Sequence, residues 1–419
     1  MSLVKNSAIY LLSNILNSAI PFLLLPVLTR YLTPSEYGQI AMFQSLVGGI
    51  AAFVGLNAVG AANRYYYEKY NTDENIGIFN GSCIQVLIFS SLFLLLICYF
   101  FSTYLENFLS IPKSWIYSAL VVSFCTFLLN LRLGQWQVRR LAIKFGSLQI
   151  GNSLLNMLLS ITFVVILNYG SQGRVYAYVI AIIIAALFAI GFLLKDKILK
   201  IFVWRLDYIK QILLFGVPLI PHVLGGFLLS SIDRFVINEK LGLSEAGFYM
   251  VAVQISMAFT IIFDAINKAF IPWLFEILIS GNEKLKSKIV RYTYLYYIFL
   301  LLISILPFLI GSWLLLLIAG NEYKPAGEVI GWLCLGQIFG GMYLMVTNYI
   351  FYTKRTASLS LVTISSGILN VILLFVLVAD FGIKGAAIAF AISKLVQFLL
   401  TWYLANKVIK MPWFTSILP

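Results

Sequence analysis

The sequence predicts an all-α polytopic membrane protein with about twelve transmembrane helices, and three observations support this. Hydrophobic residues make up 61% of the 419 positions and charged residues 11%, whereas soluble domains are about half apolar and a quarter charged. The apolar segments are long and uninterrupted, which favours helices over short alternating strands. Loops rich and poor in Lys and Arg alternate along the chain, as in multi-pass proteins.

Each span needs about 20 apolar residues to cross a hydrocarbon core of ~30 Å. The first apolar segment is predicted to be a retained span, because no small-residue cleavage site follows it. The loops between spans are too short for a soluble domain. The predicted spans lie at 7–29, 38–62, 79–103, 114–133, 147–168, 174–194, 211–232, 246–270, 291–318, 326–351, 357–379 and 384–406.

The distribution of basic residues explains the net charge of +13. With the N-terminus placed inside, 21 of the 29 Lys and Arg residues fall on inner segments, 7 fall on outer loops, and Lys394 lies within the last span. This bias satisfies the positive-inside rule and predicts that both termini are cytoplasmic. Because the charge follows the topology, nucleic acid is not an expected partner.

Three short motifs recur in the same order in the two halves of the chain. They are PSEYG at 34–38 and LSEAG at 243–247, RLA at 140–142 and RTA at 355–357, and LN at 155–156 and at 369–370. Their offsets of 209, 215 and 214 residues predict a duplicated six-helix unit. Since six is even, both copies enter the membrane from the same side, as parallel repeats.

The repeats predict an N-terminal six-helix bundle at 1–194 and a C-terminal six-helix bundle at 211–419. A cytoplasmic amphipathic connector is predicted between them, at 195–210. Its alternating basic and apolar residues, with Trp204, suit a helix lying on an anionic inner leaflet. An ordinary basic loop is the alternative.

Three segments carry a resemblance to a known family. They are PVLTRYLTPSEYG at 26–38, FGVPLIP at 215–221, and Asp233-Arg234 followed by GLSEAGFY at 242–249. Over nearly its whole length, the chain resembles the polysaccharide flippase branch of the multidrug/oligosaccharidyl-lipid/polysaccharide exporter superfamily. Members of this branch transport repeat units of O-antigen or capsular polysaccharide.

The resemblance implies a flippase rather than an enzyme, with no cofactor and no ATP hydrolysis. It implies that undecaprenyl-pyrophosphate-linked oligosaccharide moves from the inner to the outer leaflet of the bacterial cytoplasmic membrane by alternating access. Two six-helix bundles would face each other across a central cavity. The implied partners are the lipid-linked oligosaccharide substrate, membrane lipids, a polysaccharide polymerase and chain-length machinery. Coupling to a proton or cation gradient stays open.

Ionisable residues inside spans indicate a site, because each costs about 2.5–3.5 kcal/mol to insert at a helix centre. Lys394 lies about nine residues, or ~13 Å, into the last span. Ser393, Gln397 and Thr401 share its neighbourhood at helical spacing. Lys394 is predicted to be a cavity cation that binds a phosphate or a sugar carboxylate. A snorkelling or locally paired lysine is the alternative.

Proline residues predict broken helices in the first and seventh spans. Pro218 and Pro221 precede His222, the only histidine, and Pro21 and Pro26 lie in the first span. Broken helices at matching positions of two repeats indicate a transport site. His222 is therefore predicted to bind substrate, and a satisfied interhelical donor is the alternative.

The eighth span carries a polar face with Ser256, Thr260, Asp264 and Lys268 at four-residue steps. Asp264 and Lys268 have the favourable acid-first order for an ion pair. The pair is predicted to be either structural or functional. In the functional alternative, Asp264 couples transport to protons and Lys268 exchanges between Asp264 and the substrate.

Polar residues in the first half supply further candidate substrate contacts. Arg64 and Arg132 lie near inner ends of spans, where guanidinium groups suit a pyrophosphate. Topology alone also places arginines there. Asn14 and Asn17 give the first span a polar face for sugar hydroxyls.

A gate is predicted on the outer side. Arg30 ends the first span, and the pair Asp233–Arg234 ends the seventh. These charges are expected to close the outer side by crossing between the two bundles. Interfacial anchoring of each span is the alternative.

Two other functions compete with the flippase. A cation-coupled multidrug or small-molecule exporter of the same superfamily is expected to carry a buried carboxylate in the first half, but no acid lies between Lys5 and Glu36. A membrane enzyme such as a polysaccharide polymerase or acyltransferase needs a large outer loop or His/Asp pairs, which the sequence does not show.

Overall fold

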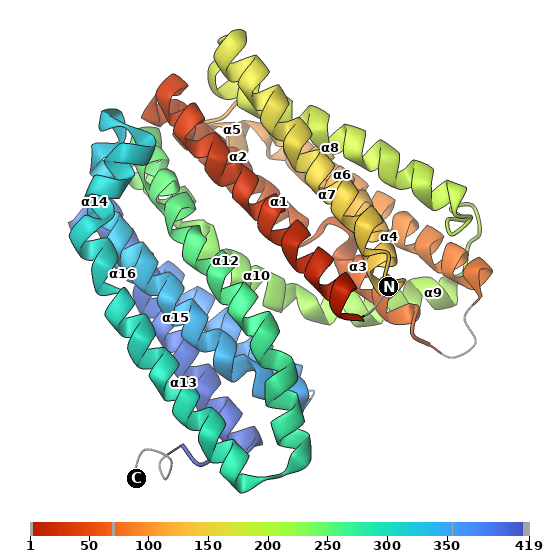
Figure 1. The fold of residues 1–419 in the computed structure, drawn as a ribbon. Coiled ribbons are helices and arrows are strands. Elements are labelled where there is room, and N and C mark those ends of the chain that lie inside the picture. Colours follow the sequence, from red (N-terminus) through yellow and green to blue (C-terminus); the bar gives the residue numbers. More distant parts are fainter. Residues whose placement is uncertain (1–2, 69–71, 354, 414–419) are drawn as a thin grey trace. The chain divides into compact units, whose positions relative to one another are not determined.

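The computed structural model describes residues 3–68, 72–353 and 355–413. These residues form sixteen α-helices and four short 3₁₀ or π segments, and no strand occurs among them. The chain divides into two compact units, Met1–Leu224 (the first unit) and Gly225–Pro419 (the second unit) (Figure 1). The division falls inside a helix, whereas the repeats predict a connector at 195–210. The two six-helix repeats themselves stay a prediction.

The helices of the first unit follow the predicted order of spans. They are α1 (Leu3–Tyr31), α2 (Pro34–Ala51), η1 (Val54–Asn57), α3 (Ala58–Tyr65), α4 (Asp73–Phe100), α5 (Ser102–Leu109), α6 (Lys113–Val138), α7 (Ala142–Ser160), η2 (Ile161–Ile166), α8 (Gly170–Lys195), α9 (Leu206–Gly216) and η3 (Val217–Leu219). Helix α10 (Ile220–Ser230) contains the boundary between the units.

The second unit is built from fewer but longer helices. They are α11 (Ile232–Leu241), α12 (Leu243–Ser280), α13 (Glu283–Ile303), α14 (Ile305–Ala319), η4 (Asn321–Ala326), α15 (Gly327–Tyr352) and α16 (Thr356–Val408). Within this unit α15 packs on α12, α14 and α16.

The lengths of these helices agree with about twelve spans. Among the described residues, nine helices are long and apolar enough to cross a membrane, and eleven are when each of two bent pairs counts as one span. Helix α16 has 53 residues and would be about 80 Å long if straight, far more than a bilayer needs. Gly382 breaks it with φ 57° and ψ −142°, so α16 forms two spans and the total reaches the predicted number.

Helix α6 lies at the centre of the first unit. It contacts α2, α3, α4, α7 and α8, and it is the most buried of the candidate spans. Helix α8 carries a stripe of buried alanines at four-residue steps, namely Ala177, Ala181, Ala185 and Ala189. Small residues let helix backbones approach closely inside a membrane, where no hydrophobic force drives helices together. In Figure 1, α1 and α7 also lie side by side within this unit.

The predicted break in the first span is wrong, whereas the break in the seventh is confirmed. Helix α1 continues through both Pro21 and Pro26, because each proline removes only one ladder hydrogen bond and neighbours can compensate inside a membrane. In the seventh span, α9 ends at Gly216 and a short 3₁₀ turn containing Pro218 follows.

A break that the sequence analysis does not predict interrupts the second span. Helices α2 and α3 meet at a bend of 54°, and Gly55, Leu56 and Asn57 have φ of 68°, 46° and 58°. Left-handed backbone costs about 1–3 kcal/mol at a non-glycine residue, so other contacts must hold it. The Gly55 N–H donates to Ser90 Oγ at 2.9 Å, and Asn57 Nδ2 donates to the Gly216 carbonyl at 3.2 Å.

The connector is not the helix that its amphipathic pattern suggests. Helix α8 ends at Lys195 and α9 begins at Leu206, and the chain between them is irregular. It lies on α4, where Asn80 Nδ2 donates to the Ile198 carbonyl at 2.9 Å and Gln85 Nε2 to the Ile201 carbonyl at 2.7 Å. These side chains satisfy backbone groups that a helix would otherwise satisfy, which favours the loop alternative.

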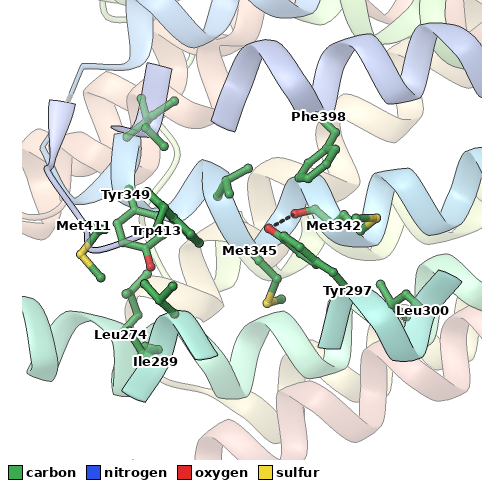
Figure 2. Packing of buried hydrophobic residues seen from close by; sticks show 14 of the residues in the cluster. Leu274, Ile289, Tyr297, Leu300, Met342, Met345, Tyr349, Phe398, Met411 and Trp413 are labelled. Atoms are coloured by element: carbon green, nitrogen blue, oxygen red, sulfur yellow. Dashed lines mark hydrogen bonds between the residues drawn. The ribbon is translucent and has the colours of Figure 1, made fainter. Parts of the chain in front are cut away.

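Aromatic side chains form much of the core of the second unit (Figure 2). Tyr297 on α13 is buried and donates to the Met342 carbonyl at 3.3 Å. Trp413, beyond the end of α16, is also buried and packs against Trp402 and Tyr349. Met411 and Trp413, which follow α16, are therefore part of this core, and the Trp413 ring adds a large buried apolar area to it.

Candidate functional site

Arg132 is the most deeply buried of the predicted site residues. It lies on α6 with no exposed surface, its Nη2 pairs with Asp196 just after α8, and its guanidinium carbon is 4.2 Å from the centre of the Trp136 ring. Its Nε and Nη1 have no hydrogen-bond partner in the described part of the chain. Both of these atoms are themselves buried, so Arg132 contributes a buried positive charge that a single carboxylate offsets.

A cavity of about 560 Å³ lies beside Arg132, inside the first unit. Helices α6, α7 and α8 line it, and its polar residues include Arg132, Lys144, Asn152, Lys195 and Asp196. Arg64, the other arginine predicted to capture pyrophosphate, is not among the lining residues. Its exposed side chain lies over the Phe215 ring at 5.8 Å. The two arginines therefore do not line this cavity together, and a shared contact with pyrophosphate stays a prediction.

A second cavity, of about 400 Å³, lies at the break in the second span. Asn57, Ser123, Thr126 and Asn130 line it, and Thr126 Oγ1 is buried without a hydrogen-bond partner among the described residues. None of these residues is among the sites predicted from the sequence. The pattern that could have indicated the break is Gly55 with Asn57 two positions later, in the middle of a predicted span. Both residue types tolerate a left-handed backbone.

The two asparagines predicted to contact sugar lie on α1 and are both half-buried. Asn17 Oδ1 accepts a hydrogen bond from Ser153 on α7, and the neighbouring Ser13 packs close to Gly146 of the same helix. Asn17 therefore helps to attach α1 to α7. A sugar contact stays a prediction for Asn14 and Asn17.

His222 lies in α10, directly after the break in the seventh span. The side chain is half-buried. Its Nδ1 is buried and has no hydrogen-bond partner within the part of the chain that the structure describes. This nitrogen is thus not the satisfied interhelical donor of the alternative, and a substrate contact at His222 stays a prediction.

Lys394 lies in the second half of α16 within the predicted polar stripe. Ser393, Gln397 and Thr401 are buried. Lys394 Nζ is 3.4 Å from Gln397 Oε1 and 5.7 Å from the centre of the Phe390 ring. No carboxylate among the described residues forms an ion pair with it. A half-buried lysine held by an amide and a ring keeps much of its charge available for an anion.

The polar face of α12 forms the ion pair that its spacing predicts. Lys268 Nζ is 2.6 Å from Asp264 Oδ2, and the two side chains are 42% and 51% exposed. One turn before Asp264, Thr260 donates to Gln337 on α15 at 2.9 Å. Exposure of this degree gives each group access to solvent or ligand, and both the structural and the proton-coupling roles stay predictions.

The predicted gate residues differ in their surroundings. Asp233 and Arg234 are buried at the start of α11, where Tyr249 donates to Asp233 Oδ2 at 2.7 Å and Arg234 Nη1 donates to the Ser230 carbonyl at 2.9 Å. Arg30 is exposed in the last turn of α1. These hydrogen bonds of Asp233 and Arg234 are therefore to residues of the second unit itself. A gating role stays a prediction.

The candidate residues divide between the two units. Asn14, Asn17, Arg30, Arg64, Arg132 and His222 belong to the first unit, and Asp233, Arg234, Asp264, Lys268 and Lys394 belong to the second. A common site shared by both groups is a prediction of the resemblance. In the first unit Arg132 is a buried cation that lines a cavity, and in the second unit Lys394 is a half-buried cation within a polar stripe.

Comparison with known proteins identifies the chain's relatives. A capsular polysaccharide biosynthesis protein, CapF of Staphylococcus aureus, is 23% identical over 97% of this chain and 100% of its own length. An uncharacterized membrane protein of Haemophilus influenzae is 27% identical over 87% of this chain and 88% of its own length. Both alignments extend across the two units.

The solved structure of the lipid II flippase MurJ in an inward closed conformation has a similar fold. It matches 97% of this chain and 90% of its own length, with a TM-score of 0.76 and 13% identity. At this identity the match shows a common fold. The profile of a polysaccharide biosynthesis protein family matches residues 3–278, about two thirds of the sequence. This multi-pass membrane protein therefore belongs to that family, as the motifs at 26–38, 215–221 and 233–249 predict.

Proposed function

We propose that the protein is a flippase for undecaprenyl-pyrophosphate-linked oligosaccharide repeat units of O-antigen or capsular polysaccharide. In this proposal it moves them from the inner to the outer leaflet of the bacterial cytoplasmic membrane, with both termini in the cytoplasm. The observation that carries the proposal is the family match over residues 3–278. The name of the relative CapF and the fold shared with the lipid II flippase support it.

The physical difficulty of this reaction is a polar sugar with an anionic pyrophosphate crossing a hydrocarbon core of ~30 Å. A cavity with polar walls and fixed cations removes much of the cost of that transfer, while the lipid tail stays in the bilayer. In the proposed mechanism Lys394 neutralises part of the anionic charge, and amide and hydroxyl groups such as Asn14 and Asn57 bind the sugar. The protein exposes the bound headgroup alternately to each side of the membrane, coupled to a proton or cation gradient.

Deleting the gene is expected to abolish surface polysaccharide while lipid-linked repeat units accumulate on the inner leaflet. The physical reason is that spontaneous flipping of so polar a headgroup is slow. The direct measurement is uptake of labelled lipid-linked oligosaccharide into proteoliposomes under imposed proton or sodium gradients, with empty liposomes as the control. Normal delivery to the outer leaflet without the protein would refute the flippase. Drug export without oligosaccharide transport would instead support the multidrug exporter.

Lys394→Gln is expected to reduce the initial transport rate at least ten-fold, or about 1.4 kcal/mol, because the half-buried cation is lost. Lys394→Arg, which keeps the charge, is expected to restore part of the rate. Lys384→Gln removes an exposed lysine from the same helix and serves as the matched control. Transport equal to wild type in Lys394→Gln, at equal amounts of inserted protein, would remove Lys394 from the site.

A further inference from the structure

The cavity beside Arg132 has features that the transport of oligosaccharide does not require. It lies wholly within the first unit, between the last turns of α6, the start of α7 and the end of α8. Three cations and one carboxylate line it, namely Arg132, Lys144, Lys195 and Asp196, which leaves a formal excess of two positive charges. Lys144 and Lys195 are exposed and form the rim, whereas Arg132 is buried behind them.

Arg132 places a buried positive charge behind the wall of this cavity. Asp196 occupies Nη2 and the Trp136 ring covers one face of the guanidinium, and Nε and Nη1 are buried with no partner among the described residues. Leaving donors of a buried charged group unsatisfied is costly. The negative charge of a phosphate on the rim lysines would offset part of that cost.

The other wall of the cavity is apolar and continues towards the lipid. Phe188 and Phe192 of α8 line it, and they also line an adjoining cavity of about 460 Å³ that includes Leu187 and Gly191. The side chains of Leu187 and Phe188 are 64% and 58% exposed, on a helix that is long and apolar enough to span a membrane. A ligand here would place an anionic head at the rim lysines, in front of Arg132, and a hydrocarbon chain along α8.

The depth of the site suits a lipid headgroup. Arg132 is six residues from the end of α6 at Val138, or about 9 Å along the helix axis. That position is close to the boundary between headgroups and acyl chains when the helix ends at the membrane surface. Basic pockets between spans at the cytoplasmic side are known to hold anionic lipid heads, and inner loops carry most of this chain's Lys and Arg.

We propose that this cavity binds one anionic phospholipid of the inner leaflet, with its phosphate on the rim lysines Lys144 and Lys195, in front of the buried Arg132, and an acyl chain along α8. The lipid is distinct from the transported substrate, so this proposal rests on the predicted topology and not on the proposed transport. The negative charge of the bound head compensates the buried charge of Arg132, and the head joins α7 and α8 at their inner ends.

The test measures lipid retention by the purified full-length protein with native mass spectrometry. Phosphatidylglycerol is expected to bind at one molecule per chain, at least ten-fold more tightly than phosphatidylethanolamine. Inorganic phosphate at millimolar concentration is not expected to displace it, because phosphate lacks the acyl chain. Equal binding of the two phospholipids would overturn the proposal. Displacement by phosphate would show a site for a free anion instead of a lipid.

Two variants locate the site without removing the buried arginine, whose loss could prevent folding. Gly151 lines the cavity, and a Cβ there meets no heavy atom within 4 Å, so Gly151→Leu should fill the space. Gly340→Leu, also in open space on α15, is the matched control. Gly151→Leu is expected to weaken phosphatidylglycerol retention at least ten-fold, and Gly340→Leu to leave it unchanged. Equal retention in both would place the lipid elsewhere.

The second variant tests the charge of the rim. Lys144→Ala combined with Lys195→Ala is expected to weaken phosphatidylglycerol retention at least ten-fold and to leave phosphatidylethanolamine unaffected. Lys197→Ala combined with Lys210→Ala removes two exposed lysines that do not line the cavity and is expected to have no effect. If both double variants lose the lipid equally, general surface charge explains the binding and the proposal is wrong.

Discussion

Asp233→Ala is expected to lower the free energy of unfolding by about 3 kcal/mol, the lower end for breaking a buried ion pair. Asp233 is only 2% exposed. Its carboxylate accepts hydrogen bonds from the Tyr249 hydroxyl at 2.7 Å and from the Arg234 backbone N–H at 2.9 Å. Its removal leaves the buried Arg234 guanidinium without a neighbouring negative charge. The effect is at the lower end because the closest ion-pair distance is 4.0 Å and Arg234 keeps the Ser230 carbonyl.

The measurement is denaturant or thermal unfolding of the protein in one detergent. Asp264→Ala is the matched control, since it removes an acid from an ion pair in the same unit whose side chains are 51% and 42% exposed. That change is expected to cost about 0.5 kcal/mol or less. Asp233→Asn, which keeps an acceptor for Tyr249, is expected to be intermediate. Similar losses in the two alanine variants would contradict the assignment of Asp233 as a buried structural charge.

Gly81→Ala is expected to lower the free energy of unfolding by about 2 kcal/mol, because the connector rests directly on this glycine. An added Cβ would lie 2.1 Å from the Lys200 carbonyl oxygen and 2.6 Å from its carbon, so the connector must move. Three of the hydrogen bonds that join the connector to α4 would be lost, at about 1 kcal/mol each. They run from Asn80 to the Ile198 carbonyl, from Gln85 to the Ile201 carbonyl, and from the Lys200 N–H to the Gly77 carbonyl. The gain in helix propensity from alanine returns about 1 kcal/mol.

Gly191→Ala is the control, and it is not expected to lower the free energy of unfolding. Gly191 also lies inside a helix of the first unit, but nothing lies within 4 Å of an added Cβ. Alanine is therefore expected to be neutral or stabilising there. Limited trypsin digestion gives a second readout, because a displaced connector frees the half-buried Lys200 from α4 and makes cleavage there faster in Gly81→Ala alone. Unchanged stability and unchanged digestion would show that the connector does not depend on contact with Gly81.

The repeated motif illustrates how much a local pattern can predict. PSEYG and LSEAG each begin a long helix, α2 and α12, with the glutamate in the first turn. In the first copy Thr33 and Glu36 form a capping box, which satisfies N–H groups that a helix start leaves unpaired. The motif therefore marks a helix start in each half. The pairing of Asp264 with Lys268 follows equally from spacing on one helix.

The contents of the candidate site could be predicted only in part. The sequence pattern indicates Arg132 as a cation near an inner end, but its partner Asp196 is 64 residues away, and the cavity that it lines is made by three helices. The residues around the break in the second span are missed altogether. Their left-handed backbone is held by Ser90 and by the Gly216 carbonyl, contacts that no local pattern reports.

The sequence alone determined that the chain crosses the membrane about twelve times, where most helices start, and to which family it belongs. These properties depend on hydrophobicity and on hydrogen bonds between residues a few positions apart. Tertiary structure alone decided that α1 continues through its prolines, that the second span breaks, and that the connector is a loop held on α4. Each of these outcomes depends on which distant group satisfies a backbone N–H or carbonyl, and that is set by packing.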